Sequence, residues 1–339
     1  MSTIVDADER LARIERLAPR PGLPIMSEVV AEIAGEAESY VAALDRFAAD
    51  GRAEEGLRLA VRLAPYWNAQ GLFAEGRTRL QALLEAAVHI SPTLRAQALE
   101  RIGTMAFEQG ANEEARSLFE QSLAAARDGR DEIAEAAAYG GLARCALMAG
   151  DLDLARRHAR ACKQIHRARG DEQALDQPLH ILAYAEYIAG DDERARARFE
   201  ETLELNRRLG NRRAVARELT NLGSVETRAG NLERAQQLCH EALRLALEIE
   251  NPLLVTYCVI NLAGVASARG QHERAARLLG TGEAMLEAAG MTLNPGTAIE
   301  YERHIERTRT ALGEAAYERA VRAGRKLDRE AAIEYALGG

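Results

Sequence analysis

Aromatic residues and proline are scarce in this sequence of 339 residues. Phe, Trp and Tyr together make up 4% of it, and it contains 8 Pro. β-Branched residues are also sparse, and no segment alternates apolar and polar residues as a half-buried strand would. These absences exclude a sheet protein. The abundant Ala, Arg, Glu and Leu are instead typical of an all-α protein.

The sequence also lacks a clustered excess of basic residues. Its 44 basic and 52 acidic residues are interspersed, and the formal net charge is −8. A surface that follows a phosphate backbone needs basic residues gathered on one face. We therefore expect no direct binding of nucleic acid by this chain.

Apolar runs long enough for a membrane span are absent as well. Residues 1–17 lack the apolar core of a secretion signal, and no run approaches the ~20 residues that cross a bilayer. We therefore expect a cytoplasmic protein that does not associate with membranes. The cysteines form no CxxC pair, which predicts buried free thiols in a reducing compartment at Cys145, Cys162, Cys239 and Cys258.

The sequence does contain an internal repeat. A glycine followed five positions later by a small residue recurs every 40 residues, at Gly110/Ala115, Gly150/Ala155, Gly190/Ala195, Gly230/Ala235 and Gly270/Ala275. We call these five the marker glycines. The pair Gly71 and Gly76 adds a sixth unit one residue out of register, since 110 − 71 = 39. A period between 20 and 50 residues predicts a solenoid or another repeat array.

Residues that begin and end helices follow the same register. Good N-cap residues lie 40 apart, at Ser91, Asp131, Asp171, Asn211 and Asn251, and each predicts the start of a helix that ends at the next marker glycine. Asp151, Asp191 and Asn231 then predict the start of a second helix. A small residue seven positions before each marker glycine permits close contact within the pair. Because one hairpin cannot bury its apolar stripe alone, we expect an α-solenoid of about six 40-residue hairpins.

The two ends of the chain depart from the repeat. Residues 1–26 read as an N-terminal helix and a Pro-rich linker, and residues 27–296 as the solenoid. The register lapses at Asn294-Pro295-Gly296, while apolar positions continue beyond it. Because terminal repeats need a polar outer face, we expect N- and C-terminal capping helices, with residues 297–339 forming the C-terminal helical cap.

The repeat skeleton resembles a known family. LGSVETRAGNLERA and LARCALMAGDLDLA are similar to the tetratricopeptide repeat, lengthened from the usual 34 residues to 40. More narrowly, LAPYWNAQGLFAEGRTRL, GTMAFEQGANEEARSLFEQSL and the closing helical segments resemble the C-terminal repeat region of the MalT- and AfsR-like signalling ATPases of bacteria. In those regulators the region follows a nucleotide-binding module and accompanies a LuxR-type DNA-binding domain or a cyclase domain. The likeness covers about 300 of the 339 residues.

The departures from those regulators concern their catalytic parts. The sequence contains no GxxxxGK[ST] phosphate loop, its two lysines, Lys163 and Lys326, lack glycine-rich loops, and neither end carries a basic helix-turn-helix. The resemblance therefore implies a scaffold without enzyme activity or cofactor that binds a protein or peptide in a concave groove, in bacterial signalling or transcriptional regulation. The alternative is a stand-alone sensor module that regulates an ATPase or cyclase in trans. The sequence leaves open whether the chain forms a homo-oligomer.

Two residue sets invite a catalytic or metal-binding interpretation. His158, Cys162 and His166 share one helical face, but Cys162 falls at a small packing position and three ligands over two turns lie too far apart for one tetrahedral ion. Glu186 and Glu226 occupy the same place in successive repeats, which suggests acid and base catalysis. No nucleophile or cofactor motif accompanies them, so we expect core packing in the first set and ion pairs with arginines of adjacent helices in the second.

The candidate binding site is the face of each first helix that packing does not use, which lines the groove in tetratricopeptide-repeat proteins. It carries the positions 13, 10, 6, 3 and 2 residues before each marker glycine. Tyrosine and arginine, the residues that most often anchor interfaces, are frequent there. The alternative is a solvated groove with incidental polar residues. The predicted groove residues are Arg144, His180, Tyr184, Tyr187, Arg217, Thr220, Ser224, Arg228 and Tyr257.

Overall fold

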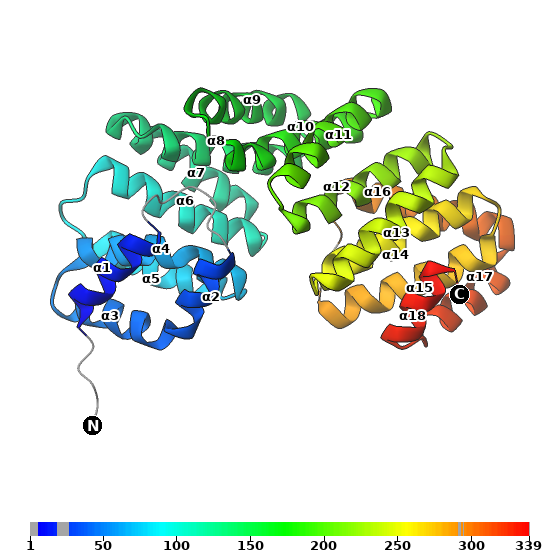
Figure 1. Ribbon diagram of the computed structural model, residues 1–339, viewed down its shortest axis with the longest axis horizontal. Helices are drawn as coiled ribbons and strands as arrows, with labels where there is room; N and C mark the ends of the chain where they lie inside the picture. Colours follow the sequence, from blue (N-terminus) through cyan, green and yellow to red (C-terminus); the bar gives the residue numbers. More distant parts are fainter. Residues whose placement is uncertain (1–5, 19–26, 291–292, 294, 339) are drawn as a thin grey trace. The chain divides into compact units, whose positions relative to one another are not determined.

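The computed structural model describes residues 6–18, 27–290, 293 and 295–338 (Figure 1). These residues form α-helices and one short 3-10 helix, and none of them lies in a strand. They divide into two compact units, Met1–Ile181 and Leu182–Gly339. Within the described residues no helix is both long and apolar enough to cross a membrane.

The first unit begins with three helices and continues with helix hairpins. Its helices are α1 (Ala7–Leu17), α2 (Ser27–Gly35), α3 (Ala37–Ala49), α4 (Ala53–Ala69), α5 (Phe73–Ala86), α6 (Pro92–Glu108), α7 (Asn112–Gly129), α8 (Glu132–Met148) and α9 (Leu152–Arg169), followed by the 3-10 helix η1 (Glu172–Leu175). Helix α10 (Asp176–Ala189) starts in the first unit and ends in the second.

The second unit completes the series of hairpins and adds three further helices. It contains α11 (Asp192–Arg208), α12 (Arg212–Arg228), α13 (Leu232–Glu248), α14 (Pro252–Ala268), α15 (His272–Ala289), α16 (Pro295–Leu312), α17 (Glu314–Gly324) and α18 (Arg329–Leu337). The pairs from α4/α5 to α14/α15 are the six predicted hairpins. The all-α solenoid fold is confirmed.

The marker glycines end the first helix of each hairpin as predicted. All five have positive φ angles, between 76° and 82°, which an L-residue with a Cβ rarely adopts. After Gly150, the amide of Asp151 donates to the carbonyl of Ala146 at 3.0 Å, so the reversed chain satisfies a carbonyl that the helix end leaves free. The same pattern closes the other first helices and fixes where each second helix begins.

Most predicted N-caps are confirmed. The side chain of Asn211 accepts from the amide of Ala214 at 3.1 Å, and equivalent bonds are made by Ser91, Asp131, Asp151, Asp191 and Asn251. At Asn231 the second helix begins as predicted, but the Asn231 side chain accepts no capping bond, and its side-chain amide instead donates to Glu226.

The prediction is wrong at Asp171, where η1 precedes α10. The reason is Pro178. A helix that began at residue 172 would need a backbone N–H donor at residue 178, and proline has none. A start at Asp176 instead places Pro178 in the first turn of the helix, where backbone amides have no helical partner.

Small residues bring the two helices of a hairpin together. A Cβ added to Gly223 on α12 would lie 2.5 Å from the sulfur of Cys239 on α13, so only glycine fits there. Cys239 is fully buried, as are Phe119 and Phe199 at the equivalent position of other hairpins. All four cysteines are free and buried, as predicted, and burial raises the pKa of Cys162 to about 12.

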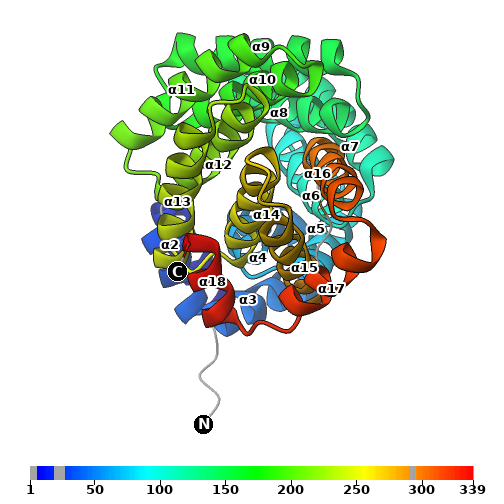
Figure 2. The same ribbon diagram turned by 90° about the vertical axis from the view of Figure 1, so that its right-hand side faces the viewer.

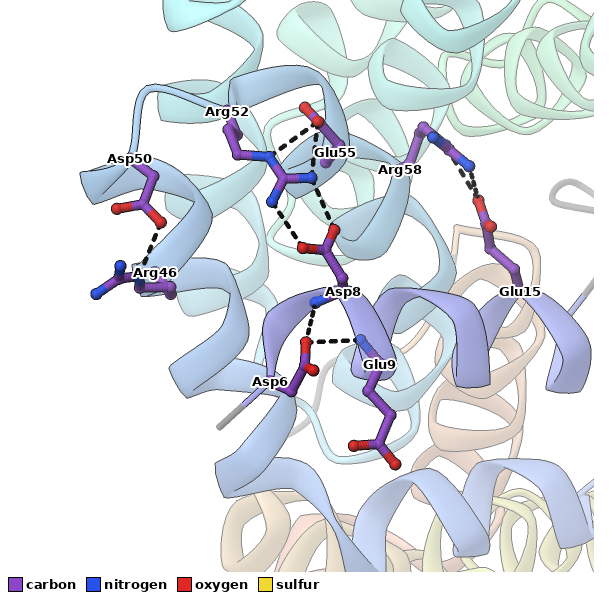
Figure 3. Close-up of polar contacts among 9 residues, drawn as sticks. All are labelled: Asp6, Asp8, Glu9, Glu15, Arg46, Asp50, Arg52, Glu55 and Arg58. Carbon is purple, nitrogen blue, oxygen red and sulfur yellow. Dashed lines mark hydrogen bonds and ion pairs between the residues drawn. The ribbon is translucent and has the colours of Figure 1, made fainter. Parts of the chain in front are cut away.

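The N-terminal helix α1 packs on α3 and α4 of its own unit. Leu11 and Ile14 are buried, and Arg52 at the start of α4 grips the carboxylate of Asp8 with two bonds of 2.7 and 2.9 Å. Figure 3 shows this pair together with the Glu15 and Arg58 pair further along α1. The predicted Pro-rich linker, residues 19–26, lies outside the described residues.

The last three helices do not extend the repeat. Helix α17 packs along α15, so closely that a Cβ at Gly280 would overlap the carbonyl of Val321. Helix α18 follows, and Arg274 on α15 donates to the carbonyl of Tyr335 at 3.0 Å. Helix α16, which precedes both in sequence, lies beside α14 and α15 (Figure 2).

Candidate functional site

The predicted groove residues fall in both units, and Arg144 and His180 belong to the first. Arg144 on α8 is half-buried, pairs with Glu108 and lies 4.0 Å from the centre of the Phe107 ring. His180 on α10 is also half-buried. Arg144 is therefore already engaged by a carboxylate and an aromatic ring of the preceding first helix, α6.

The main cluster, in the second unit, is built from Tyr184, Tyr187 and Arg228. The two tyrosine rings lie 5.7 Å apart, and the Arg228 guanidinium lies 4.3 Å from the centre of the Tyr187 ring. Arg228 also donates to the carbonyl of Tyr187 at 3.0 Å and pairs with Asp192 at the start of α11. Burial raises the pKa of Tyr187, so this phenol stays neutral. The arrangement holds one guanidinium in a fixed position between two helices.

Helix α16 covers this cluster. The hydroxyl groups of Thr297 and Tyr184 lie 3.4 Å apart, and Glu300 pairs with Arg228 at 3.2 Å. Further along α16, the hydroxyl groups of Thr308 and Ser267 are 3.0 Å apart, and a Cβ at Gly264 would overlap the imidazole of His304. Tyr184 and Gly264 lie six positions before a marker glycine, Ser267 three and Arg228 two. We call the side of α10, α12 and α14 that carries these positions the first-helix face.

The expectation that packing does not use the predicted groove positions is therefore wrong for three of them. Tyr184 and Tyr187 are only 7% and 5% exposed because α16 and neighbouring repeat helices enclose them. Thr220 is 5% exposed for a different reason. It bonds Cys258 on α14 at 3.4 Å, and Asn261 donates to its carbonyl at 2.9 Å, so the position ten residues before the marker faces the next first helix.

The remaining predicted residues are accessible in part. Arg217, Ser224 and Tyr257 are half-buried on α12 and α14. Arg217 donates to Glu218 at 2.7 Å, and the carboxylate of Glu218 is fully buried. Arg217 thus compensates a buried charge while a third of its side chain stays exposed.

The two repeat-related carboxylates form ion pairs with arginines, as expected. Glu226 is fully buried and accepts from Arg196 on α11 at 2.7 and 3.2 Å and from Asn231 at 2.7 Å. Burial raises the pKa of Glu226, but the hydrogen bonds from Arg196 and Asn231 outweigh that effect and leave it lowered. Glu186 lies 3.6 Å from Arg198. Both carboxylates therefore connect neighbouring helices.

The residues considered for metal binding lie in packed surroundings. Cys162 is 1% exposed and His166 5%, while the His158 ring lies 5.7 Å from the Tyr139 ring. Burial lowers the pKa of both histidines. In the part of the chain that the structure describes, no three His, Cys, Asp or Glu residues are grouped as metal ligands.

Sequence reasoning did not identify the α16 residues. Thr297, Glu300, His304 and Thr308 are spaced three and four positions apart, which places them on one side of a helix. That polar stripe was the available signal. It lies outside the repeat register, so nothing in the period relates it to the first-helix face.

Comparison with family profiles identifies the repeat. Two profiles described as tetratricopeptide repeat match residues 94–168, which span α6 to α9, and residues 215–252, which span α12 and α13. The chain contains tetratricopeptide repeats. Both matched segments contain marker glycines, so the tetratricopeptide repeats coincide with the 40-residue period. A search of curated proteins finds no match to this sequence.

Solved structures with tetratricopeptide repeats or similar folds have low sequence identity. Aspartyl phosphate phosphatase F from Bacillus subtilis is 11% identical, with a TM-score of 0.64 over 96% of each chain. NprR in complex with its cognate peptide NprX is 14% identical, with a TM-score of 0.60 over 93% of this chain and 87% of that one.

A third structure is a Signal Transduction ATPase with Numerous Domains from Pyrococcus horikoshii, which has a tetratricopeptide repeat sensor. It is 15% identical to this chain, with a TM-score of 0.59. The alignment covers 93% of this chain and 50% of that protein. At these identities the three similarities establish a shared fold.

Proposed function

We propose that this chain is a non-enzymatic tetratricopeptide-repeat scaffold that binds a protein or peptide in bacterial signalling or transcriptional regulation. The observation that carries the proposal is the environment of Arg228. The guanidinium of Arg228 lies over the Tyr187 ring and forms an ion pair with Asp192. It forms a second ion pair with Glu300 of α16, the helix that lies on the first-helix face. A fixed arginine on an aromatic ring is a frequent anchor of protein interfaces.

The similarity to NprR in complex with a peptide supports the same proposal, because that protein shares the fold and binds a peptide. Arg217 and Tyr257 extend the candidate surface along the same side of the repeats. Both are accessible in part. The groove is thus proposed to combine arginine with tyrosine, which suits a peptide with acidic or aromatic residues.

Capture of partners by cross-linking and mass spectrometry, followed by affinity measurement with the captured partner, tests this function. Replacing Arg217 by Ala should weaken binding by ~1–3 kcal/mol, the range of an interface anchor. Arg194→Ala is the control, since this side chain is 72% exposed on a second helix, α11. Equal affinity of both variants, with unchanged circular dichroism, would contradict the proposed groove.

Catalysis is not part of the proposal. Glu186 and Glu226 are each paired with arginine, and the likeness to a phosphatase concerns the fold. The purified chain should neither bind nor hydrolyse ATP, and it should release no phosphate from an aspartyl phosphate. Turnover of either substrate would show that an enzyme activity has been overlooked.

A second candidate function is a stand-alone sensor that regulates an ATPase or cyclase in trans. The similarity to an ATPase with a tetratricopeptide repeat sensor favours it, since this chain spans about half of that protein. If an ATPase or cyclase is captured as partner, its turnover should change when the chain is added. An unchanged rate at saturating chain would leave the scaffold function and reject the sensor function.

A further inference from the structure

Helix α16 lies on the first-helix face in the way a bound helical peptide would. Its residues Thr297, Glu300, His304 and Thr308 follow one another at three, four and four positions, close to the 3.6-residue period of a helix. They meet Tyr184 on α10, Arg228 on α12, and Gly264 and Ser267 on α14. One side of a single helix therefore contacts three successive first helices.

The contacts of α16 with this face are mostly polar. In the ion pair between Arg228 and Glu300, the Arg228 side chain is 21% exposed and the Glu300 side chain 16%. Among the α16 residues with described side chains, only Tyr301 and Thr308 are buried, and Ile299 is 49% exposed. Helix α15, by contrast, buries Leu278 and Leu279 completely. Because apolar burial supplies most of the packing free energy, α16 is held more weakly than the repeat helices.

Helix α17 packs on α15 at the end of the repeat stack, and α16 contacts α15 as well, where the hydroxyl of Tyr301 donates to Glu283 at 3.2 Å. The backbones of α15 and α17 approach each other closely at Gly280 and Gly324. A Cβ added to Gly324 would overlap the carbonyl oxygen of Arg277 on α15. These backbone contacts between α15 and α17 do not involve α16, although Glu283 on α15 bonds both Tyr301 of α16 and Arg325 of α17. Displacement of α16 would uncover the first-helix face and break the Tyr301 contact with α15, while α17 stays packed on α15.

We propose that α16 is a built-in, displaceable ligand of the first-helix face, and that the partner is an amphipathic helix whose carboxylate replaces Glu300 at Arg228. This inference rests on the proposed function and specifies the chemistry of the partner. Arg228 is already oriented by the Tyr187 ring and by Asp192, so it stays in position when α16 leaves. A pre-oriented anchor lowers the entropy cost of binding a replacement helix.

A synthetic peptide of residues 295–312 tests the proposal when added to the full chain. In wild type, the tethered α16 competes with it. Thr308→Lys places a charge at a fully buried position against Ser267 and should release α16. The variant should bind the peptide at least tenfold more tightly than wild type, and the amides of α16 should exchange faster with deuterium. Thr310→Lys is the matched control, since Thr310 is exposed on the same helix.

A double-mutant cycle checks that the peptide occupies the face proposed here. In the Thr308→Lys chain, Arg228→Gln and a Glu300→Gln peptide should each weaken binding about threefold to tenfold, and together little more than either alone. Additive effects would place the peptide elsewhere. If Thr308→Lys impairs folding, Glu300→Gln within the chain is the milder variant for releasing α16.

The outcomes separate this inference from the proposed function. Fast exchange of α16 without tighter peptide binding would show that α16 is structural only and would overturn the inference. A captured partner that binds wild type and Thr308→Lys equally would overturn it as well, while leaving the proposed function intact. Peptide binding by the variant without any captured partner would support the inference and count against the proposed function.

Discussion

Arg228 on α12 and Glu300 on α16 form an ion pair at 3.2 Å although 72 positions separate them in the sequence. Arg228 meanwhile donates to Asp192 and to the carbonyl of Tyr187. One guanidinium thus links α10, α11, α12 and α16. This connection makes the first-helix face of the second unit both a part of its packing and a candidate binding surface.

Tyr187 should matter to stability more than an exposed groove residue would. Its ring is 5% exposed and contacts Arg228, Tyr184 and Phe199. Tyr187→Ala should lower the free energy of unfolding by about 3 kcal/mol, because it leaves a cavity the size of an aromatic ring. Tyr187→Phe keeps the ring and should cost less than half as much. Urea denaturation of both variants measures the difference, and equal losses would contradict the packing role.

Gly264 should be required for α16 to dock. A Cβ there would overlap the imidazole of His304. Gly264→Ala should therefore speed deuterium exchange across residues 297–312 and cost about 1–3 kcal/mol through overpacking, partly offset by the better helix propensity of alanine. Gly35→Ala is the control, since nothing lies within 4 Å of an added Cβ at that position. Unchanged exchange in the Gly264 variant would rule out this contact.

The ion pair of Glu226 should make the stability of the folded protein depend on pH in the acid range. The pKa of Glu226 is lowered from 4.5 in the folded state. The carboxylate therefore adds to the free energy of unfolding above pH 4.5, and this contribution is lost as the pH falls through the lowered folded-state pKa. Melting temperatures of wild type should therefore fall more steeply below pH 4.5 than those of Glu226→Gln. At pH 7 the variant should be the less stable protein, because Arg196 loses its carboxylate partner. Parallel pH curves would mean that the ion pair contributes nothing.

The repeat part of the fold could be predicted because its signals are local. Each marker glycine ends a helix through its own φ angle, and an N-cap such as Asn211 acts within three residues. The prediction was wrong at Asp171, where the requirement of Pro178 for a first-turn position outweighed the cap. A repeat period alone does not report such a local exception.

The candidate site could be predicted only in part, because a repeat gives positions on a helix but not what covers them. Tyr184 and Arg228 were placed on the first-helix face by their distance from a marker glycine. The covering residues Thr297 and Glu300 lie outside the repeat, up to 113 positions away, and no local pattern relates them to their partners. Burial of the tyrosines therefore follows from tertiary structure alone.

The C-terminal segment 297–339 is proposed to act as a cap, and truncation tests it. Deleting the segment removes α17 from the buried face of α15, which includes Leu278 and Leu279. The truncated chain should melt at a lower temperature and aggregate, since an exposed repeat end presents apolar surface. Deleting residues 326–339 removes α18 alone and should have a smaller effect. A monomeric truncated chain with an unchanged melting temperature would refute the cap.

His304 should make the docking of α16 sensitive to mild acid. Burial against Gly264 lowers its pKa from 6.5 to about 4, an effect that Glu300 opposes and that Arg307 and Arg303 reinforce. The released or unfolded chain therefore binds a proton more readily than the folded one. The contribution of the neutral His304 ring to the free energy of unfolding is complete above pH 6.5 and is lost as the pH falls toward 4.

Between pH 7 and pH 4, wild type should accordingly lose about 3 kcal/mol more stability than His304→Gln, which cannot take up the proton. Deuterium exchange of residues 297–312, divided by the intrinsic amide rate at each pH, should rise as the pH falls in wild type and change less in the variant. The other histidines whose pKa is lowered by burial, His158, His166 and His240, are common to both proteins, so the difference isolates His304. Equal protection of the α16 amides at both pH values in wild type, after correction for the intrinsic exchange rate, would show that protonation of His304 does not control its docking.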